Sequence, residues 1–295
     1  FRFRLRFDFR GNGLGHIFNL GAWTLALIAV NQVTYFAIAR MGSAATLQGK
    51  EDGVAAAGNT VYALGHLISQ VPHGIITVSV ATAMIPTLAR LAADRQYENF
   101  AAQLGTTLRF VALFILPLAT LIACLGKPLG NVIGSLSASS ENTVAIGTTI
   151  TAFSLVTVGF SLHYVVLRGF YSLEDTRTPF LIQLVIAIIN IGLAFTLTRL
   201  VEPLWVSTAL AISLGPAYLV GLIVALWVIS RRTSALINRA MASFAIRLLF
   251  VCALAVAAVA LSRWAWLALE FGDARFTDYV VQVIVFGIIG GLTIV

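Results

Sequence analysis

A stripe of polar side chains runs along one apolar stretch of the chain and could form hydrogen bonds where little water is present. Neighbouring members lie three or four residues apart, so they share one face of a helix. They are Asn59, Tyr62, His66, Gln70, His73 and Thr77. Helices packed together could satisfy such groups, and the wall of a hydrated cavity is the alternative. Two histidines on one stripe favour the cavity and leave proton coupling open.

Other apolar stretches carry fewer polar residues. Asn31 and Tyr35 share one helical face with Thr24 and Thr34, where packing and cavity lining are equally consistent with the spacing. Asn190 stands alone in a later stretch, which favours a hydrogen bond between helices over an ion ligand. These residues are further candidates for a polar site in the membrane, but their spacing does not indicate a chemical reaction.

A stripe of mostly small hydroxyl residues predicts helix packing rather than chemistry. Its members are Thr151, Ser154, Thr157, Ser161, Tyr164 and Arg168. No Asp or Glu lies in the middle of an apolar stretch, and the sequence contains no nucleophile–base pair, phosphate loop or cluster with metal-ligand spacing. We therefore predict no enzyme activity, no cofactor and no metal site.

The composition of the chain indicates which kind of structure holds these residues in place. Hydrophobic residues make up 59% of the chain and charged residues 11%, whereas soluble domains carry about 25% charged residues. Apolar stretches of ~18 residues or more recur along the sequence and predict transmembrane helices. We expect an all-α polytopic membrane protein with eight spans, at 17–39, 57–89, 107–126, 144–167, 180–198, 204–229, 244–262 and 279–295. Pro72 and Pro86 should kink the second span, which is too long for one straight crossing.

The basic residues lie at the ends of apolar stretches, which is typical of topology determinants and not of a nucleic-acid site. With the N-terminal segment in the cytoplasm, 13 of the 19 Lys and Arg residues fall in inside loops. The positive-inside rule therefore places both ends of this chain in the cytoplasm.

The predicted spans divide the chain into four parts. Residues 1–16 form a basic cytoplasmic linker on lipid headgroups, 17–230 a six-helix lobe, 231–243 an interfacial linker and 244–295 a terminal helix pair. The first residue is not Met and the last lies inside an apolar stretch. We expect the chain to be a piece of a longer polypeptide whose terminal pair is truncated.

Three segments resemble the MurJ (MviN) family of lipid II flippases. The loop between the fourth and fifth spans reads FYSLEDTRTPF, with capping residues before Pro179 in the first turn of the next helix. The second span reads QVPHGIITVSVATAMIPTLAR, with Pro72, Gly74, Pro86 and Arg90 in the family's pattern. The third reads LRFVALFILPLATLIACLGKPL. The resemblance covers most of the chain.

The resemblance implies the C-terminal half of a flippase of the MOP exporter superfamily. The first six spans would form a MATE-like lobe, and the terminal pair would shape a groove for a lipid tail. The family flips lipid II, the polyprenyl-pyrophosphate-linked peptidoglycan precursor, across the bacterial cytoplasmic membrane by alternating access. The expected partners are this or a similar lipid, membrane lipids and cell-wall synthesis proteins, with no nucleic acid.

This chain departs from the family's pattern at three places. Leu67 stands near the position where the family often carries a cavity arginine. Asn190 is similar to the amide of a sodium site found in some members, but Ala194, one turn on, offers no carboxylate. The N-terminal lobe, with the family's other cavity arginines, is absent from this chain. Sodium coupling is therefore not supported by the sequence.

Within this interpretation the candidate residues fall into two groups. The substrate cavity would be lined by His66, Gln70, His73, Asn59, Tyr62, Asn31 and Tyr35. A cytoplasmic gate or loop clasp would be formed by Arg168, Asp175, Arg177 and Pro179. A flippase for another polyprenyl-linked glycan and a non-transporting scaffold for cell-wall synthesis remain alternatives.

Overall fold

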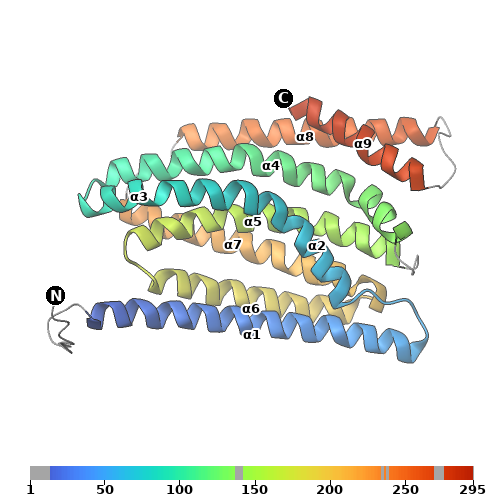
Figure 1. Ribbon diagram of the computed structural model, residues 1–295, viewed down its shortest axis with the longest axis horizontal. Helices are drawn as coiled ribbons and strands as arrows, with labels where there is room; N and C mark the ends of the chain where they lie inside the picture. Colours follow the sequence, from blue (N-terminus) through green and yellow to red (C-terminus); the bar gives the residue numbers. More distant parts are fainter. Residues whose placement is uncertain (1–13, 137–141, 234–235, 237–238, 269–275, 295) are drawn as a thin grey trace, which may run out of the picture.

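The computed structural model describes residues 14–136, 142–233, 236, 239–268 and 276–294. The described chain folds into long helices that run nearly side by side (Figure 1). The predicted linker at 1–16 lies almost entirely outside the described residues. The helices are α1 (Leu14–Asp52), α2 (Asn59–Pro72), η1 (His73–Val78), α3 (Ser79–Ala93), α4 (Tyr97–Leu136), α5 (Thr143–Ser172), α6 (Arg177–Leu200), η3 (Pro203–Trp205), α7 (Val206–Thr233), α8 (Arg239–Ala268) and α9 (Phe276–Ile294).

The predicted all-α polytopic fold is confirmed. Within the described residues, seven helical segments are long and apolar enough to cross a membrane, and α9 contains a shorter apolar stretch, Tyr279–Leu292. Several helices extend well beyond the predicted spans, and α4 has 40 residues where the sequence predicts a span at 107–126. Hydropathy marks only the part of a helix that suits lipid, whereas backbone hydrogen bonding continues until a turn interrupts it.

The second predicted span is one helical run with a change of geometry in the middle. Pro72 ends α2, and the six residues of η1 then form a π-helix before α3 begins. Proline has no N–H to donate to the preceding turn, which explains why the α-helical pattern is interrupted at this point. Single π turns inside helices occur frequently at functional sites.

Helix α5 lies in the middle of the bundle, between α4 and α7, and α6 packs against α7 and α1 (Figure 1). The core contains Phe100, Phe153 and Phe170, which are fully buried. Helices α8 and α9 pack on each other and on α4. Arg231 and Arg232 belong to the last turn of α7, and Arg239 begins α8. The segment between the two helices is therefore shorter than the linker predicted at 231–243. The division into lobe and terminal pair stays a prediction.

Helices α3 and α5 end on the same side of the bundle (Figure 1). In the turn after each helix, one residue adopts the left-handed conformation with positive φ. Arg95 has φ 55° and Glu174 has φ 56°. In both turns the next residue's N–H reaches back five positions, from Gln96 to the Leu91 carbonyl at 2.9 Å and from Asp175 to the Phe170 carbonyl at 3.0 Å. This is the Schellman motif, usually completed by glycine. A larger residue there costs roughly 1–2 kcal/mol in backbone strain.

Candidate functional site

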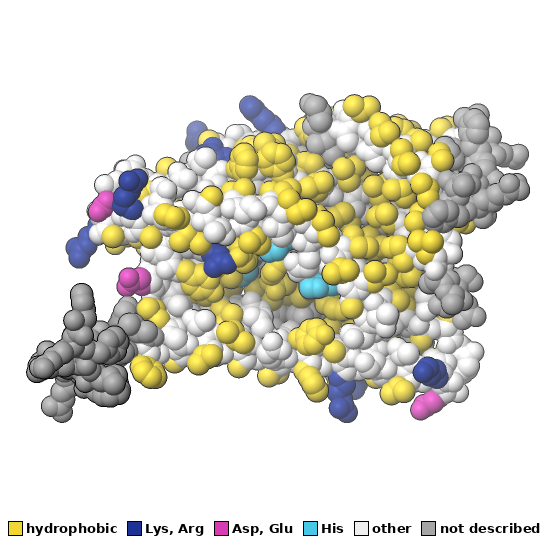
Figure 2. Space-filling view, in the orientation of Figure 1, with side chains coloured by type: hydrophobic (Ala, Val, Ile, Leu, Met, Phe, Trp, Pro, Cys, Tyr) yellow, Lys and Arg dark blue, Asp and Glu magenta, His cyan; other side chains and the backbone are white. Residues whose placement is uncertain are grey.

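Two adjoining cavities of about 220 and 480 Å3 lie between α1, α2, α5, α6 and α7. Both are lined by Asn31, His66, Gln183, Leu214 and Tyr218, so we treat them as one space and call it the central cavity. Figure 2 shows histidine side chains in a hollow on this face of the molecule, with a Lys or Arg side chain close by. Among the described residues no Asp or Glu lines the central cavity.

The polar stripe of α2 forms one wall of this space. Asn59, Tyr62 and His66 line the smaller part, and His66 and Gln70 line the larger part. The His66 Nε2 and Gln70 Nε2 atoms are 3.0 Å apart and hydrogen bonded, and the His66 ring lies parallel to the Tyr62 ring at 6.4 Å. The structure thus brings four members of the predicted stripe together around one cavity.

His73, the first residue of the π turn, is separated from the other members of the stripe. Its side chain is only 5% exposed and is absent from the lining of the central cavity. The ring packs against Phe160 at 4.4 Å and Tyr164 at 5.0 Å. Its Nδ1 is 3.1 Å from the Ser161 hydroxyl. The structure places His73 between η1 and α5 rather than beside His66.

The opposite wall comes from α1 and α6. Asn31 lines both parts of the cavity, and its Oδ1 accepts a hydrogen bond of 2.8 Å from Gln183 Nε2. Tyr35 lines the smaller part and is 64% exposed, so it lies at the mouth. Asn190 lines the same part, and its Oδ1 accepts a hydrogen bond of 2.9 Å from Ser213. The described residues contain no cluster of His, Cys, Asp or Glu that could hold a metal ion.

Helix α5 contributes a wall that the sequence analysis did not assign to the cavity. Residues that recur at helical spacing on one broad face line the larger part: Val156, Phe160, His163, Tyr164, Leu167, Arg168 and Tyr171. The signal that could have found this wall is the same spacing rule used for α2. His163 and Tyr171 were overlooked because the small hydroxyl residues on this helix predict packing.

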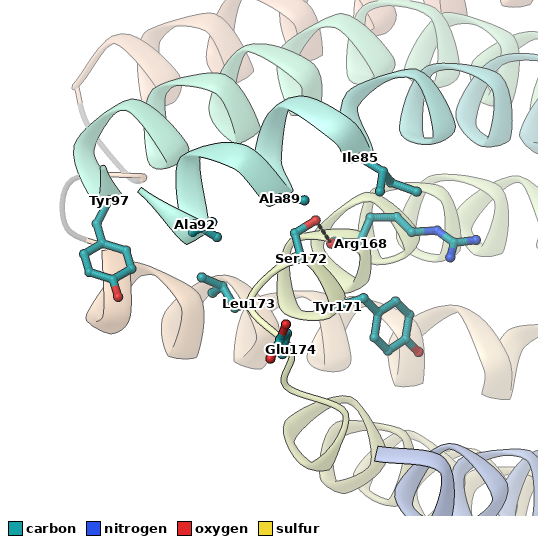
Figure 3. Close-up of a pocket in the computed structure, with 10 residues that line it drawn as sticks. Ile85, Ala89, Ala92, Tyr97, Arg168, Tyr171, Ser172, Leu173 and Glu174 are labelled. Atoms are coloured by element: carbon teal, nitrogen blue, oxygen red, sulfur yellow. Dashed lines mark hydrogen bonds between the residues drawn. The ribbon is translucent and has the colours of Figure 1, made fainter. Parts of the chain in front are cut away.

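Arg168 also lines a second cavity of about 500 Å3 at the end of the bundle where α3 and α5 stop, which we call the end cavity (Figure 3). Ala92, Tyr97 and Glu174 line it too. In Figure 3 the Arg168 and Tyr171 side chains extend away from the turn that carries Glu174 and toward the middle of the bundle. Both residues line the central and the end cavity, and so they lie at the partition between the two.

The loop between α5 and α6 is fastened to α7 by an ion pair, which we call the loop clasp. The Asp175 carboxylate pairs with Arg232 and accepts a hydrogen bond of 2.9 Å from the Thr178 backbone N–H. Arg232 also donates to the Thr178 hydroxyl at 3.0 Å. Partial burial tends to raise the pKa of the Asp175 carboxyl, but the bonds from Thr178 and Arg232 outweigh it and hold that pKa below its ordinary value.

The same loop also contacts α1. The Thr176 hydroxyl donates to the Leu20 carbonyl at 3.2 Å, and the Arg177 guanidinium lies 5.5 Å from the centre of the Trp23 ring. Pro179 is buried in the first turn of α6. Of the four predicted gate residues, Asp175, Arg177 and Pro179 therefore lie at this junction of α1, α6 and α7, while Arg168 lies in the cavities.

Long apolar helices around a cavity lined by polar side chains define the class, an integral membrane protein. The family model described as lipid II flippase MurJ matches residues 1–273. The chain therefore belongs to the lipid II flippase MurJ family, a family of bacterial inner-membrane transporters.

Curated relatives of the family share part of their length with this chain. A probable lipid II flippase MurJ from Rhizobium meliloti (strain 1021) is 29% identical over 131 residues, which cover 44% of this chain and 24% of the relative. One from Rhizobium tropici is 28% identical over 203 residues, covering 65% of this chain and 37% of the relative. The aligned part thus spans well under half the length of these relatives.

A solved structure has the same fold. It is described as lipid II flippase MurJ in an inward closed conformation, and it matches with a TM-score of 0.67 at 16% sequence identity. The match covers 98% of this chain and 55% of the solved chain. At this identity the likeness supports the fold alone.

Proposed function

We propose that this chain is the C-terminal half of a transporter that flips lipid II, or a closely similar polyprenyl-pyrophosphate lipid, across the cytoplasmic membrane. The single observation that carries the proposal is the central cavity, where hydrogen-bond donors from five helices converge and no described carboxylate is present. Such a lining suits a ligand that combines sugar hydroxyls with negatively charged phosphate oxygens. Membership of the family supports the same substrate.

The open side of the chain is where we place the missing N-terminal lobe. Leu67, Val71 and Ile75 form an apolar row on the α2–η1 run and are 66%, 56% and 68% exposed. Leu67 and Val71 lie one α-helical turn apart and so share one face, and they directly follow the cavity residues His66 and Gln70 in the sequence. A second lobe against this face would complete the wall of the cavity, and rocking of the two lobes would expose the cavity to each side in turn.

We assign both ends of the chain to the cytoplasm, because the basic residues concentrate at the end of the bundle that holds the α5–α6 loop. The cavity residues His66, Gln70, Asn59, Tyr62, Asn31 and Tyr35 would contact the substrate headgroup, and His73 would support them from behind. The loop clasp, with Arg177 and Pro179, would hold the cytoplasmic end as a gate. Residues 231–243 would connect the lobe to the terminal pair at the membrane surface, where cell-wall synthesis proteins are candidate partners.

Complementation tests this function. The full-length gene is expressed in cells whose own lipid II flippase is depleted, and lipid II export is followed by labelling the precursor at the outer surface. Restored growth and export are expected. Failure of export with normal membrane expression would contradict the proposal. Export of another polyprenyl-linked glycan in the same cells would identify the alternative substrate class.

A further inference from the structure

Arg168 is the one Lys or Arg side chain that lines the central cavity among the residues that the structure describes. It lies near the end of the α5 wall, about one turn before the last wall residue, Tyr171. The central cavity contains no described carboxylate to balance its charge. A cation in such a place is costly unless an anion joins it, because low-polarity surroundings solvate a charge poorly.

Aromatic groups hold the guanidinium in position without neutralising it. Its central carbon lies 4.5 Å from the centre of the Tyr164 ring and 5.9 Å from that of Tyr171. One terminal nitrogen donates a hydrogen bond to the Tyr164 hydroxyl. The Nε atom is buried and has no hydrogen-bond partner. The planar fork of an arginine matches phosphate oxygens, and this fork retains unused donors.

His163 adds a second unsatisfied group to the same wall. The residue is 1% exposed, lines the larger part of the central cavity, and neither of its ring nitrogens has a partner. Buried imidazoles normally find a hydrogen bond, so an orphaned one beside a cavity points to a partner supplied by a ligand. The centre of the His163 ring lies 6.0 Å from that of Tyr218.

Another arginine of the same end shows the contrast. Arg232 is paired with Asp175 and bonded to Thr178, and it has no place in either cavity. Its charge is used to fasten the loop. Among the described residues Arg168 has no ion pair, and its guanidinium is held by the rings of Tyr164 and Tyr171 instead.

We propose that Arg168, with His163 on the same wall, forms an oxyanion seat that receives the pyrophosphate group of the transported lipid at the partition between the central and end cavities. The proposal rests on the proposed function for the identity of the lipid, and on the geometry for the anion. Arg168 would bind phosphate oxygens through its free N–H groups, and His163 would donate from its ring.

The test uses the purified full-length protein and measures its affinity for undecaprenyl pyrophosphate and for undecaprenol, which lacks the anion. Arg168→Gln should weaken binding of the pyrophosphate lipid about 10- to 100-fold, the loss expected for a charge-assisted contact, and leave undecaprenol binding unchanged. Arg199→Gln is the matched control, because Arg199 also stacks on an aromatic side chain one turn earlier, Phe195, at 3.8 Å, but lines neither cavity. It should bind like the wild type.

Two results would overturn the seat: wild-type protein that binds both lipids equally well, or an Arg168→Gln protein that retains wild-type affinity for the pyrophosphate lipid. Arg168→Met keeps the aliphatic stem against the tyrosine rings and serves if the glutamine variant does not fold. Inorganic pyrophosphate should compete with the lipid but bind more weakly. If inorganic pyrophosphate bound as tightly as undecaprenyl pyrophosphate, the site would recognise a soluble anion, and the lipid part of the proposal would be overturned.

The export assay separates this inference from the proposed function. Cells that export no lipid II, together with Arg168-dependent binding of undecaprenyl pyrophosphate, would reject lipid II as substrate and support the seat. Normal lipid II export by the Arg168→Gln protein with unchanged affinity would support the function and reject the seat.

Discussion

The two halves of α5 meet their neighbours in opposite ways. In its first half, the backbone touches α4, where Gly126, Gly130 and Gly134 lie four residues apart and face Gly147 and Thr143. A Cβ added at Gly130 would lie 2.6 Å from the Gly147 backbone. Small residues at this spacing let membrane helices approach closely. In its second half, from Phe160 to Tyr171, large aromatic and polar side chains stand around the central cavity.

Hydrogen bonding differs between the two halves in the same way. In the first half, Thr149 lies 2.9 Å from the Ser207 hydroxyl and 3.0 Å from that of Thr208, and these hydroxyls satisfy one another. In the second half, both nitrogens of His163 and the Nε of Arg168 find no partner. Close packing in one half can stabilise a helix whose other half keeps unsatisfied groups for a ligand.

The largest effect should come from breaking the glycine contact. Gly130→Ala places a methyl group against the Gly147 backbone, which cannot move without shifting α5. We expect a loss of about 1–3 kcal/mol or more in unfolding free energy, measured by thermal unfolding in detergent. Gly192→Ala is the control, because nothing lies within 4 Å of its added Cβ. It should be neutral or stabilising, and equal losses in the two variants would contradict the close contact.

Replacing His163 should separate stability from binding. His163→Leu removes two unpartnered nitrogens, so the unfolding free energy should rise by about 1–2 kcal/mol. Affinity for undecaprenyl pyrophosphate should fall. His73→Leu is the comparison, because it deletes the bond to the Ser161 hydroxyl and should destabilise the protein. If His163→Leu is destabilising and leaves the affinity unchanged, the imidazole is a packing residue.

A smaller effect is expected from the hydroxyl cluster of the packed half. Thr149→Val leaves the buried Ser207 hydroxyl without this bond and should cost about 0.6–1.7 kcal/mol of unfolding free energy. Thr196→Val is the control, since Thr196 is exposed and its hydroxyl bonds only the Gly192 carbonyl, at 2.9 Å. A loss in the control as large as in Thr149→Val would remove the distinction between the sites.

The smallest effect should come from the loop clasp, whose Arg232 side chain is 45% exposed. Asp175→Asn should cost less than about 1 kcal/mol, as exposed ion pairs do. The lowered pKa of Asp175 means that the clasp is intact at neutral pH and opens only as the pH falls below the ordinary carboxyl value of 3.8. Distance measurements between spin labels on the loop and on α7 should show that opening. A clasp that opens near pH 6 would contradict this assignment.

The sequence predicted most of the fold and part of the site. Apolar stretches located the helices, and Pro72 marked the change of geometry in the second span. Spacing on α2 grouped Asn59, Tyr62, His66 and Gln70, which the structure places around one cavity. The same spacing put His73 on that row, whereas in the structure its ring is buried against Phe160 of α5 at the start of the π turn.

The wall on α5 was not predicted, although the same spacing rule applies there, because the small hydroxyl residues of that helix favoured packing over cavity lining. Nothing local to His163 or Tyr171 tells which neighbour they face. The sequence placed Arg168 both on the polar stripe of the fourth span and in the candidate cytoplasmic gate, and its side chain extends back toward the middle of the bundle (Figure 3). Side-chain direction depends on the neighbouring helices and not on the sequence position alone.

The sequence by itself determined that this chain is a membrane-spanning helical bundle, because an apolar stretch of sufficient length has few other stable environments. It also determined which residues share a helical face, since that follows from the helical period. Only the tertiary structure decided which faces meet, which groups are satisfied and where a charge is left without a partner. Those properties arise from contacts between helices far apart in the chain, as between Asp175 and Arg232 or Asn31 and Gln183.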